Sequence, residues 1–365
     1  MPDPIDLFSM PRAKKDSAYY TLGPSMASAY PDRVAGHNVP YNNLLLLLLR
    51  RPWTSPRRVL CVHWSTVLYG SKYVLKSLAF LCMNTLALFL LKHLFGFKVV
   101  WVLHNNFGHD YPHPWIDRIG RAVITHFADA LIAQQQATRR EEAPNNPGKR
   151  VAYIPHSNYV GAFGPMAGDR AGLRTRFGFG PDDIVLLSLG AVKPYKRIER
   201  FIDALRELDP ALSARLRLWI VGKGDAQYIA FLQERAKGLE NVRIEAQYIP
   251  DEEVPAYAAC ADYGVFYFDE SELTSASVLL SLSYGLPVIS RSIAGTEMIR
   301  DGENGFVFEN DEDLAAIIKR LPQLKRPDPE AVAATLDGSD WQNVERKYLE
   351  LYESLTGGSD AIVSA

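Results

Sequence analysis

Short apolar runs, each followed by a polar or glycine-containing turn, recur along most of the chain. The clearest are residues 59–64, 98–104, 130–133, 183–190 and 216–221. Runs of this length that are apolar throughout, without strict alternation, are typical of strands buried on both faces of a parallel sheet. Segments with helical spacing lie between several of them, as at residues 116–127. Residues 1–40 show only weak periodicity, and the polar segment Glu141–Arg150 predicts a loop. The pattern predicts an α/β protein with parallel sheets.

Two segments of the first half are more apolar than the rest. Leu44–Leu49 is a run of six leucines followed by Arg50 and Arg51, and Ser77–Leu91 is flanked by Lys72, Lys76, Lys92, His93 and Lys98. Apolar helices with basic flanks are typical of proteins that lie on an anionic membrane surface. A helix over Ser77–Leu91 would be about 22 Å long, short of the ~30 Å hydrocarbon core. We therefore expect contact with a membrane surface without spanning, with a buried crossover helix as the alternative.

Composition narrows the class of protein further. A length of 365 residues predicts two domains. A net charge of −2 gives no indication of general nucleic-acid binding. The three cysteines (Cys61, Cys82, Cys260) lie in apolar contexts without metal-ligand spacing, which predicts buried thiols in a reducing compartment. The first residues contain no apolar core of a signal peptide, so we expect a cytoplasmic protein.

Polar residues follow the predicted strands of the first half. The run at 98–104 leads into HNNFGHD, which offers His104, His109 and Asp110. Histidine titrates near neutral pH and a carboxylate can accept a proton from a hydroxyl group, so these three are candidates for general acid–base catalysis. His63, His156 and Asn158 follow other strands and are expected on the acceptor side. Zinc is an alternative use of the histidines, but their spacing fits no standard ligand set.

The second half is organised around residues 268–300. An acidic cluster there precedes the polar turn Thr274–Ser277, and the apolar run from Val278 ends at Gly285. Thr274 or Ser275 can cap a helix whose first N–H groups, including that of Ser277, are suited to a phosphate. Glu272 is placed to hold a sugar hydroxyl group beside that phosphate. The alternative is an ordinary βαβ unit with a polar loop.

Other residues of the second half fit a nucleotide site. Gly190 ends a strand and is followed by Lys193 and Lys196, which are placed to neutralise a diphosphate. Tyr248 lies in a loop that could contact a nucleotide base. Asp311–Asp313 resembles a metal-binding DxD motif, but helix capping explains it better because it opens a helical segment. No ATP-type phosphate-binding loop is present, and no metal or other cofactor is expected.

The order of these motifs resembles GT-B glycosyltransferases. In the second half the matching segments are residues 190–197, LWIVGKGD at 218–225, residues 248–266, and ELTSASVLLSLSYGLPVIS at 272–290. In the first half, NVPYNNLLLLLL, VLCVHW, VVWVLHNNFGHD and IPHSNY are similar to motifs of bacterial exopolysaccharide β-1,4-mannosyltransferases of the xanthan-pathway type. The resemblance extends from about Asn38 to Tyr352.

The resemblance implies a particular architecture. Two Rossmann-like domains would face each other across a cleft, with residues 1–160 as the acceptor-binding, membrane-associating domain and residues 161–335 as the nucleotide-sugar-binding domain. Residues 336–365 would form a helix that returns to the first domain. Lys196 would bind the diphosphate, Glu272 the sugar, and the Thr274–Ser277 amides would lie near the phosphates. The larger retaining family has a second glutamate in its E-x7-E motif, where this chain has Leu280. The exopolysaccharide group also lacks it.

The function implied is transfer of a hexose, with mannose from GDP-mannose expected, onto a lipid-diphosphate-linked oligosaccharide. The enzyme would be peripheral to the inner face of the plasma membrane, and inversion of configuration is expected. Three alternatives remain open: a retaining GT-B transferase using a UDP-sugar, a catalytically idle sugar-nucleotide-binding subunit, and a GT-B-fold epimerase acting on a UDP-sugar.

Overall fold

The computed structural model describes residues 3–11, 22–39, 43–104, 111–268, 275–293 and 296–357. The chain divides into two compact units. The first unit comprises Met1–His156 and Trp341–Ala365, and the second comprises Ser157–Asp340. Each contains a six-stranded sheet whose neighbouring strands are all parallel, with helices packed against it. The predicted α/β class, with two Rossmann-like domains, is confirmed.

The sheet of the first unit has the strand order β2-β1-β3-β4-β5-β6. Its strands are β1 (Ile5–Met10), β2 (Val34–Asn38), β3 (Arg58–Val62), β4 (Lys98–Leu103), β5 (Ala130–Ala133) and β6 (Arg150–Tyr153). Its helices are α1 (Leu22–Ala29), α2 (Leu44–Arg50), α3 (Val74–His93), α4 (Pro114–Phe127), α5 (Gln136–Asn145) and α14 (Trp341–Leu355), with the short 3-10 helix η3 (Ser65–Leu68).

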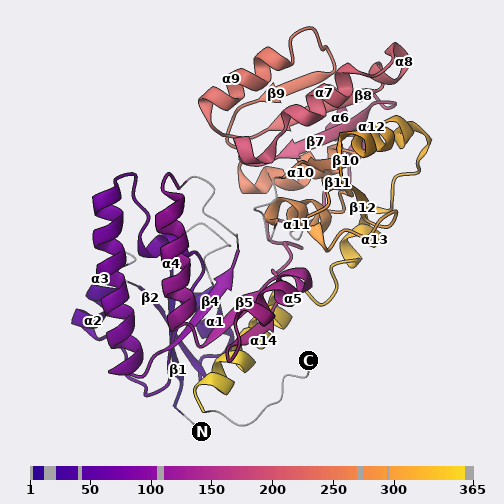
Figure 1. Ribbon diagram of the computed structural model, residues 1–365. Helices are drawn as coiled ribbons and strands as arrows, with labels where there is room; N and C mark the ends of the chain where they lie inside the picture. Colours follow the sequence, from indigo (N-terminus) through magenta and orange to yellow (C-terminus); the bar gives the residue numbers. More distant parts are fainter. Residues whose placement is uncertain are drawn as a thin grey trace. The chain divides into compact units, whose positions relative to one another are not determined.

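Successive residues of a strand point to opposite faces of the sheet, and in this sheet the residues on both faces are mostly apolar. Helices therefore cover both faces. Val59, Val100 and Ile132 belong to a core cluster that α1 and α14 close. Trp101 has the opposite orientation in β4, and the guanidinium group of Arg121 on α4 lies 4.9 Å from its ring centroid. Helices α2, α3 and α4 pack side by side (Figure 1).

The last helix, α14, is part of the first unit, as the resemblance implied. Its buried residues include Tyr348 and Tyr352, which join the core cluster. Trp341 Nε1 donates a hydrogen bond of 2.7 Å to Ser25 Oγ on α1. The hydroxyl group of Ser25 in turn donates to the carboxylate of the buried Glu345. A segment more than 300 residues from α1 thus completes the same core.

The sheet of the second unit has the strand order β12-β11-β10-β7-β8-β9. Its strands are β7 (Ile184–Leu189), β8 (Leu216–Val221), β9 (Val242–Glu245), β10 (Tyr263–Phe266), β11 (Val288–Arg291) and β12 (Gly305–Phe308). Its helices are α6 (Arg170–Phe177), α7 (Glu199–Arg206), α8 (Pro210–Ser213), α9 (Ala226–Arg235), α10 (Val254–Cys260), α11 (Ala276–Ser283), α12 (Asp311–Arg320) and α13 (Pro329–Ala334). The 3-10 helices are η4 (Pro194–Lys196), η5 (Asp251–Glu253) and η7 (Leu321–Gln323).

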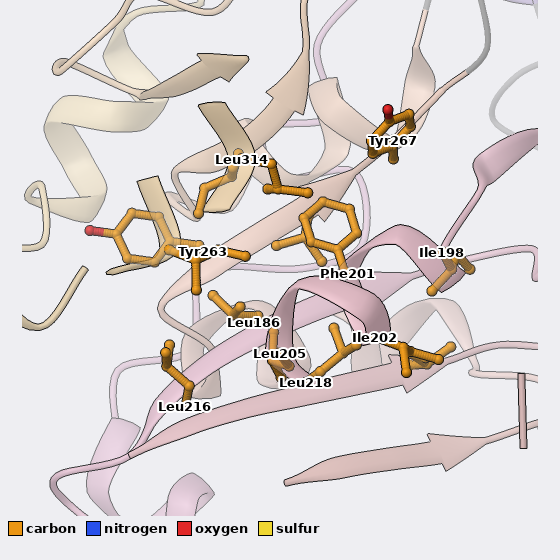
Figure 2. Packing of buried hydrophobic residues seen from close by; sticks show 14 of the residues in the cluster. Leu186, Ile198, Phe201, Ile202, Leu205, Leu216, Leu218, Tyr263, Tyr267 and Leu314 are labelled. Atoms are coloured by element: carbon orange, nitrogen blue, oxygen red, sulfur yellow. The ribbon is translucent and has the colours of Figure 1, made fainter. Parts of the chain in front are cut away.

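Figure 2 shows the core between α7 and the strands of the second unit. Phe201 and Leu205 of α7 pack with Leu186 and Leu218, which come from the neighbouring strands β7 and β8. Leu314 of α12 belongs to the same cluster. This packing fixes α7, and with it the turn that joins β7 to α7.

Some local predictions were wrong. The weakly periodic first 40 residues contain β1, α1 and β2. The segment Glu141–Arg150, predicted as a loop, is a turn only at residues 146–149, because its first half ends α5 and Arg150 begins β6. It is polar because most of this part of α5 is solvent-exposed, not because the backbone is irregular. Cys61 and Cys260 are buried, but Cys82 is exposed on α3. Residues 311–313 open a helix as predicted, but they form its first turn, and Asn310 is the capping residue.

Candidate functional site

Two segments of the second unit lie at the carboxyl edge of its sheet: the β7–α7 turn and the start of α11. Strands β7 and β10 are parallel neighbours, and α11 follows β10 in the chain. Ligands of open parallel sheets bind outside the carboxyl ends of the strands. The predicted donor residues Gly190, Lys196 and Ser277 therefore stand at the edge of the sheet where a ligand is expected.

Glycines shape the β7–α7 turn. Gly190 has φ +110°, a conformation that residues with a side chain rarely adopt. Gly222, at the end of the neighbouring strand, lies so close that a Cβ atom on it would be 1.9 Å from the carbonyl oxygen of Gly190. The two turns can approach this closely only because Gly222 carries no side chain.

The structure brings Lys196 and Ser277 together beside Gly190. The Nζ atom of Lys196 lies 3.3 Å from Ser277 Oγ and donates a hydrogen bond to it. A Cβ atom on Gly190 would be 3.4 Å from that Nζ atom and 3.7 Å from that hydroxyl oxygen. Lys196 is only 5% exposed, so its charge is held in a poorly solvated place where it acts strongly on an anion. Lys193 lies in the same turn, immediately before η4.

The N-terminus of α11 supplies further groups suited to an anion. Ser275 is the capping residue, and its side chain accepts a hydrogen bond of 3.3 Å from the Val278 N–H group. Ser277 lies in the first turn, where backbone N–H groups and the helix dipole favour negative charge. Glu272 and Thr274 lie outside the described residues. Leu280 follows Ser277 by one turn, and its apolar side chain cannot bind a ribose hydroxyl group.

Tyr248 lies farther along the same edge. It follows β9, which β8 separates from β7. Its side chain is 69% exposed. An exposed aromatic ring beside the carboxyl edge is suited to stack on a planar base. The contact between Tyr248 and a nucleotide base stays a prediction.

In the first unit, His63 and His104 are in direct contact. They follow the paired strands β3 and β4, and His63 Nδ1 lies 3.2 Å from His104 Nε2. Trp64 stacks on His104 with a centroid distance of 4.4 Å and an interplanar angle of 15°. His156, after β6, is close enough to influence the titration of both. Three predicted residues therefore form one cluster, whereas His109 and Asp110 lie outside the described residues.

His63 and His104 are neutral at physiological pH. Burial lowers the pKa of His63 to about 4, and repulsion by His156 contributes to the shift. Burial lowers the pKa of His104 well below its ordinary value, with further contributions from His63 and His156. A neutral imidazole can accept a proton or a hydrogen bond, so His104 is chemically able to serve a hydroxyl nucleophile.

Sequence reasoning missed two partners of His104. Gln134 lies close enough to influence its pKa, and Trp64 stacks on it. Gln134 directly follows the buried strand β5, so the rule that selected His104 would also have selected Gln134.

Asn158 is held in the second unit. Its N–H group donates to Ser339 O at 2.8 Å, and its side-chain oxygen accepts from the Val160 N–H group at 3.3 Å. Its predicted role on the acceptor side stays a prediction. Among the described residues, no three His, Cys, Asp or Glu side chains are grouped to hold a metal ion.

Comparison with known proteins finds a likeness for the second unit. Residues 183–323 match the family model described as "Glycosyl transferases group 1". This segment includes the β7–α7 turn and α11. The match covers less than half of the chain, so the likeness to this family is one of the segment.

Curated relatives of the chain are named for different substrates. D-inositol 3-phosphate glycosyltransferase of Geodermatophilus obscurus is 27% identical over 58% of this chain and 49% of its own length. GDP-mannose-dependent alpha-(1-6)-phosphatidylinositol monomannoside mannosyltransferase of Mycolicibacterium smegmatis is 30% identical, over 60% and 58% respectively. GDP-mannose:glycolipid 4-beta-D-mannosyltransferase of Xanthomonas campestris pv. campestris is 29% identical, over 48% and 50%. The chain spans about half the length of the curated relatives it matches.

Solved structures extend the likeness to both units. The structure of Anabaena HepE in complex with UDP has a TM-score of 0.70 and 15% identity, and the match covers 96% of this chain and 100% of HepE. At this identity the likeness concerns the fold alone. The chain has the GT-B fold.

Proposed function

We propose that the protein is a hexosyltransferase that transfers mannose from GDP-mannose to a lipid-diphosphate-linked oligosaccharide. The observation that carries the proposal is the meeting of Lys196, Ser277 and Gly190 at the N-terminus of α11. An amino group, a hydroxyl group and helical N–H groups around one point suit a diphosphate, and their positive potential stabilises the nucleoside diphosphate as it leaves.

The choice of sugar follows from the relatives. Two of them, from Mycolicibacterium smegmatis and Xanthomonas campestris, are named for GDP-mannose and for lipid-containing acceptors. The motifs of the first half of this chain resemble those of exopolysaccharide β-1,4-mannosyltransferases of the xanthan-pathway type. In our proposal Lys193 assists Lys196, Ser275 orients the start of α11, Tyr248 contacts the base, and Glu272 and Thr274 contribute to donor binding. No metal is required, because Lys196 and the helix N-terminus already supply positive potential.

For the chemical step we propose inversion. An acceptor oxygen attacks the anomeric carbon, the bond from that carbon to the diphosphate oxygen breaks, and the hydroxyl proton passes to a base. His109 and Asp110 are the first candidates for the base. His104 is the third: its ring is neutral, but its lowered pKa makes it a weaker base than an ordinary histidine. His63, His156 and Asn158 are proposed on the acceptor side.

Nucleotide titration tests the proposal. Calorimetry would compare GDP, UDP, ADP and their sugar conjugates with the wild type, Lys196→Met and, as a control, Lys237→Met, an exposed lysine of the second unit. We expect preference for GDP and GDP-mannose, with binding weakened at least about tenfold by Lys196→Met because a charge-assisted phosphate contact is lost. The thermal transition of each variant checks folding.

The outcomes separate the hypotheses. Preference for UDP would retain a transferase but overturn mannose as the donor sugar. Binding of no nucleotide by the folded wild type would contradict a transferase. Sugar-nucleotide binding without any transfer to lipid-linked acceptors would favour the idle subunit.

A further inference from the structure

The outward face of α3 is apolar. Leu75, Ala79, Cys82, Leu86 and Phe89 follow one another at alternating spacings of four and three residues, and all are exposed. Leu75 is 82% exposed and Leu86 is 59% exposed. The opposite stripe, which includes Leu81, Leu88 and Leu91, is buried. A helix with one buried face normally presents polar residues to water, so the core of the first unit does not account for this stripe.

The neighbouring helices continue the apolar surface. Helices α2 and α4 pack on α3 (Figure 1). Leu49 of α2 is 71% exposed, and Trp115 and Ile119 of α4 are exposed one turn apart. Ten of the fourteen exposed large apolar side chains among the described residues lie on these three helices or directly beside their ends. We call this surface the α2–α4 face. Exposed large apolar side chains gathered on three packed helices are a feature of interaction sites.

Charge indicates what the α2–α4 face contacts. Residues 33–109 contain nine lysines and arginines and no aspartate or glutamate, although the whole chain has a net charge of −2. Arg50, Arg51, Lys72 and Lys76 are exposed. The Arg51 guanidinium group lies 4.8 Å from the Phe95 ring centroid and Lys76 Nζ lies 5.4 Å from that of Phe80. Apolar side chains can enter the acyl layer of an anionic bilayer, and the cations around them can contact its headgroups.

We infer that the α2–α4 face docks on an anionic lipid bilayer, with α3 lying along the surface. Helix α3 has 20 residues and is long and apolar enough to cross a membrane. However, it joins the paired strands β3 and β4. The side chain of its buried Asn84 donates a hydrogen bond of 2.7 Å to Leu68 O. Spanning would remove these groups from the core, so only the outward stripe enters the lipid. The inference deepens the proposed function by naming the surface that receives a lipid-linked acceptor.

Vesicle flotation tests the inference without donor or acceptor. Phosphatidylcholine vesicles with and without phosphatidylglycerol would be mixed with the full chain, Leu86→Ser/Phe89→Ser, and Lys72→Glu/Lys76→Glu. The matched controls in the second unit are Phe231→Ser and Lys237→Glu, whose side chains are also exposed. Thermal unfolding verifies that each variant is folded.

We expect the wild type and both controls to bind vesicles that contain phosphatidylglycerol, more weakly at high salt. The leucine–phenylalanine variant should bind at least about tenfold more weakly because it loses apolar burial. The lysine variant should bind at least about tenfold more weakly and lose most of the salt dependence.

Three results would overturn the inference. The wild type could fail to bind anionic vesicles, or the α3 variants could bind as the wild type does. In the third, the chain is a dimer that binds no vesicles and dissociates when Leu86 and Phe89 are replaced. The last would show that the face binds a second copy of the chain. Because no sugar nucleotide is present, vesicle binding can succeed even if nucleotide binding contradicts the proposed function.

Discussion

The amino group of Lys196 lies 3.3 Å from the hydroxyl oxygen of Ser277, although 81 residues separate the two in the sequence. The pairing of β7 with β10 brings them together, because the turn after one strand and the helix after the other leave the same edge of the sheet. A cation and a helix N-terminus can then both stabilise an anion bound at the same point. Neither group alone would identify a phosphate site.

Replacing Gly190 by alanine should damage this site. The residue has φ +110°, and a new Cβ atom would lie 3.4 Å from Lys196 Nζ. We expect a loss of about 1–3 kcal/mol in the free energy of unfolding and clearly weaker nucleotide binding. Urea denaturation and calorimetry would measure the two effects. The control is Gly168→Ala, because a Cβ atom there meets nothing within 4 Å. Equal nucleotide affinity in Gly190→Ala and the wild type would argue against a phosphate at this point.

The histidine cluster should make stability depend on pH. Burial lowers the pKa of His63 from 6.5 to about 4. Above pH 6.5 the ring is neutral in both the folded and the unfolded chain. Between pH 6.5 and about 4 mainly the unfolded chain binds the proton, so the free energy of unfolding falls as pH is lowered. We expect His63 to contribute about 2 kcal/mol to this fall, less than the full shift implies because its side chain is partly exposed.

Urea denaturation at pH 7.5 and pH 5 would measure this effect. His63→Gln should reduce the difference between the two pH values. His126→Gln, which changes an exposed histidine, should leave it as in the wild type. An unchanged difference in His63→Gln would show that His63 is not held neutral by its surroundings.

The buried Glu345 should matter far more than the neighbouring Glu350. Glu345 accepts a hydrogen bond from Ser25 and joins α14 to α1. Glu350 forms an i,i+4 pair of 2.7 Å with Arg346 on the surface of α14. Glu345→Ala should lower the free energy of unfolding by about 1–3 kcal/mol, whereas Glu350→Ala should cost about 0.5 kcal/mol or less. Chemical denaturation would compare them, and equal losses would contradict the proposed docking of α14 through Glu345.

The sequence predicted most buried strands well. The strands expected at residues 130–133 and 216–221 have those bounds in the structure. They are short, mostly apolar and bounded by polar residues or glycine, so local pattern suffices. The sequence pattern did not predict β1, because the region around it is weakly periodic, although its six residues are all buried. Its identity as a strand depends on pairing with β2 and β3, which lie farther along the chain.

For the candidate site, the sequence by itself determined the chemical groups. Gly190 and Lys196 follow one strand, and Ser275 and Ser277 begin the helix that follows another. A parallel sheet places both segments along one edge. The tertiary structure alone decided that Lys196 meets Ser277 and that His63 meets His104. It also decided which side of α3 is left in contact with solvent. These outcomes depend on strand order and helix packing, which are contacts between distant segments and are not encoded in any local spacing.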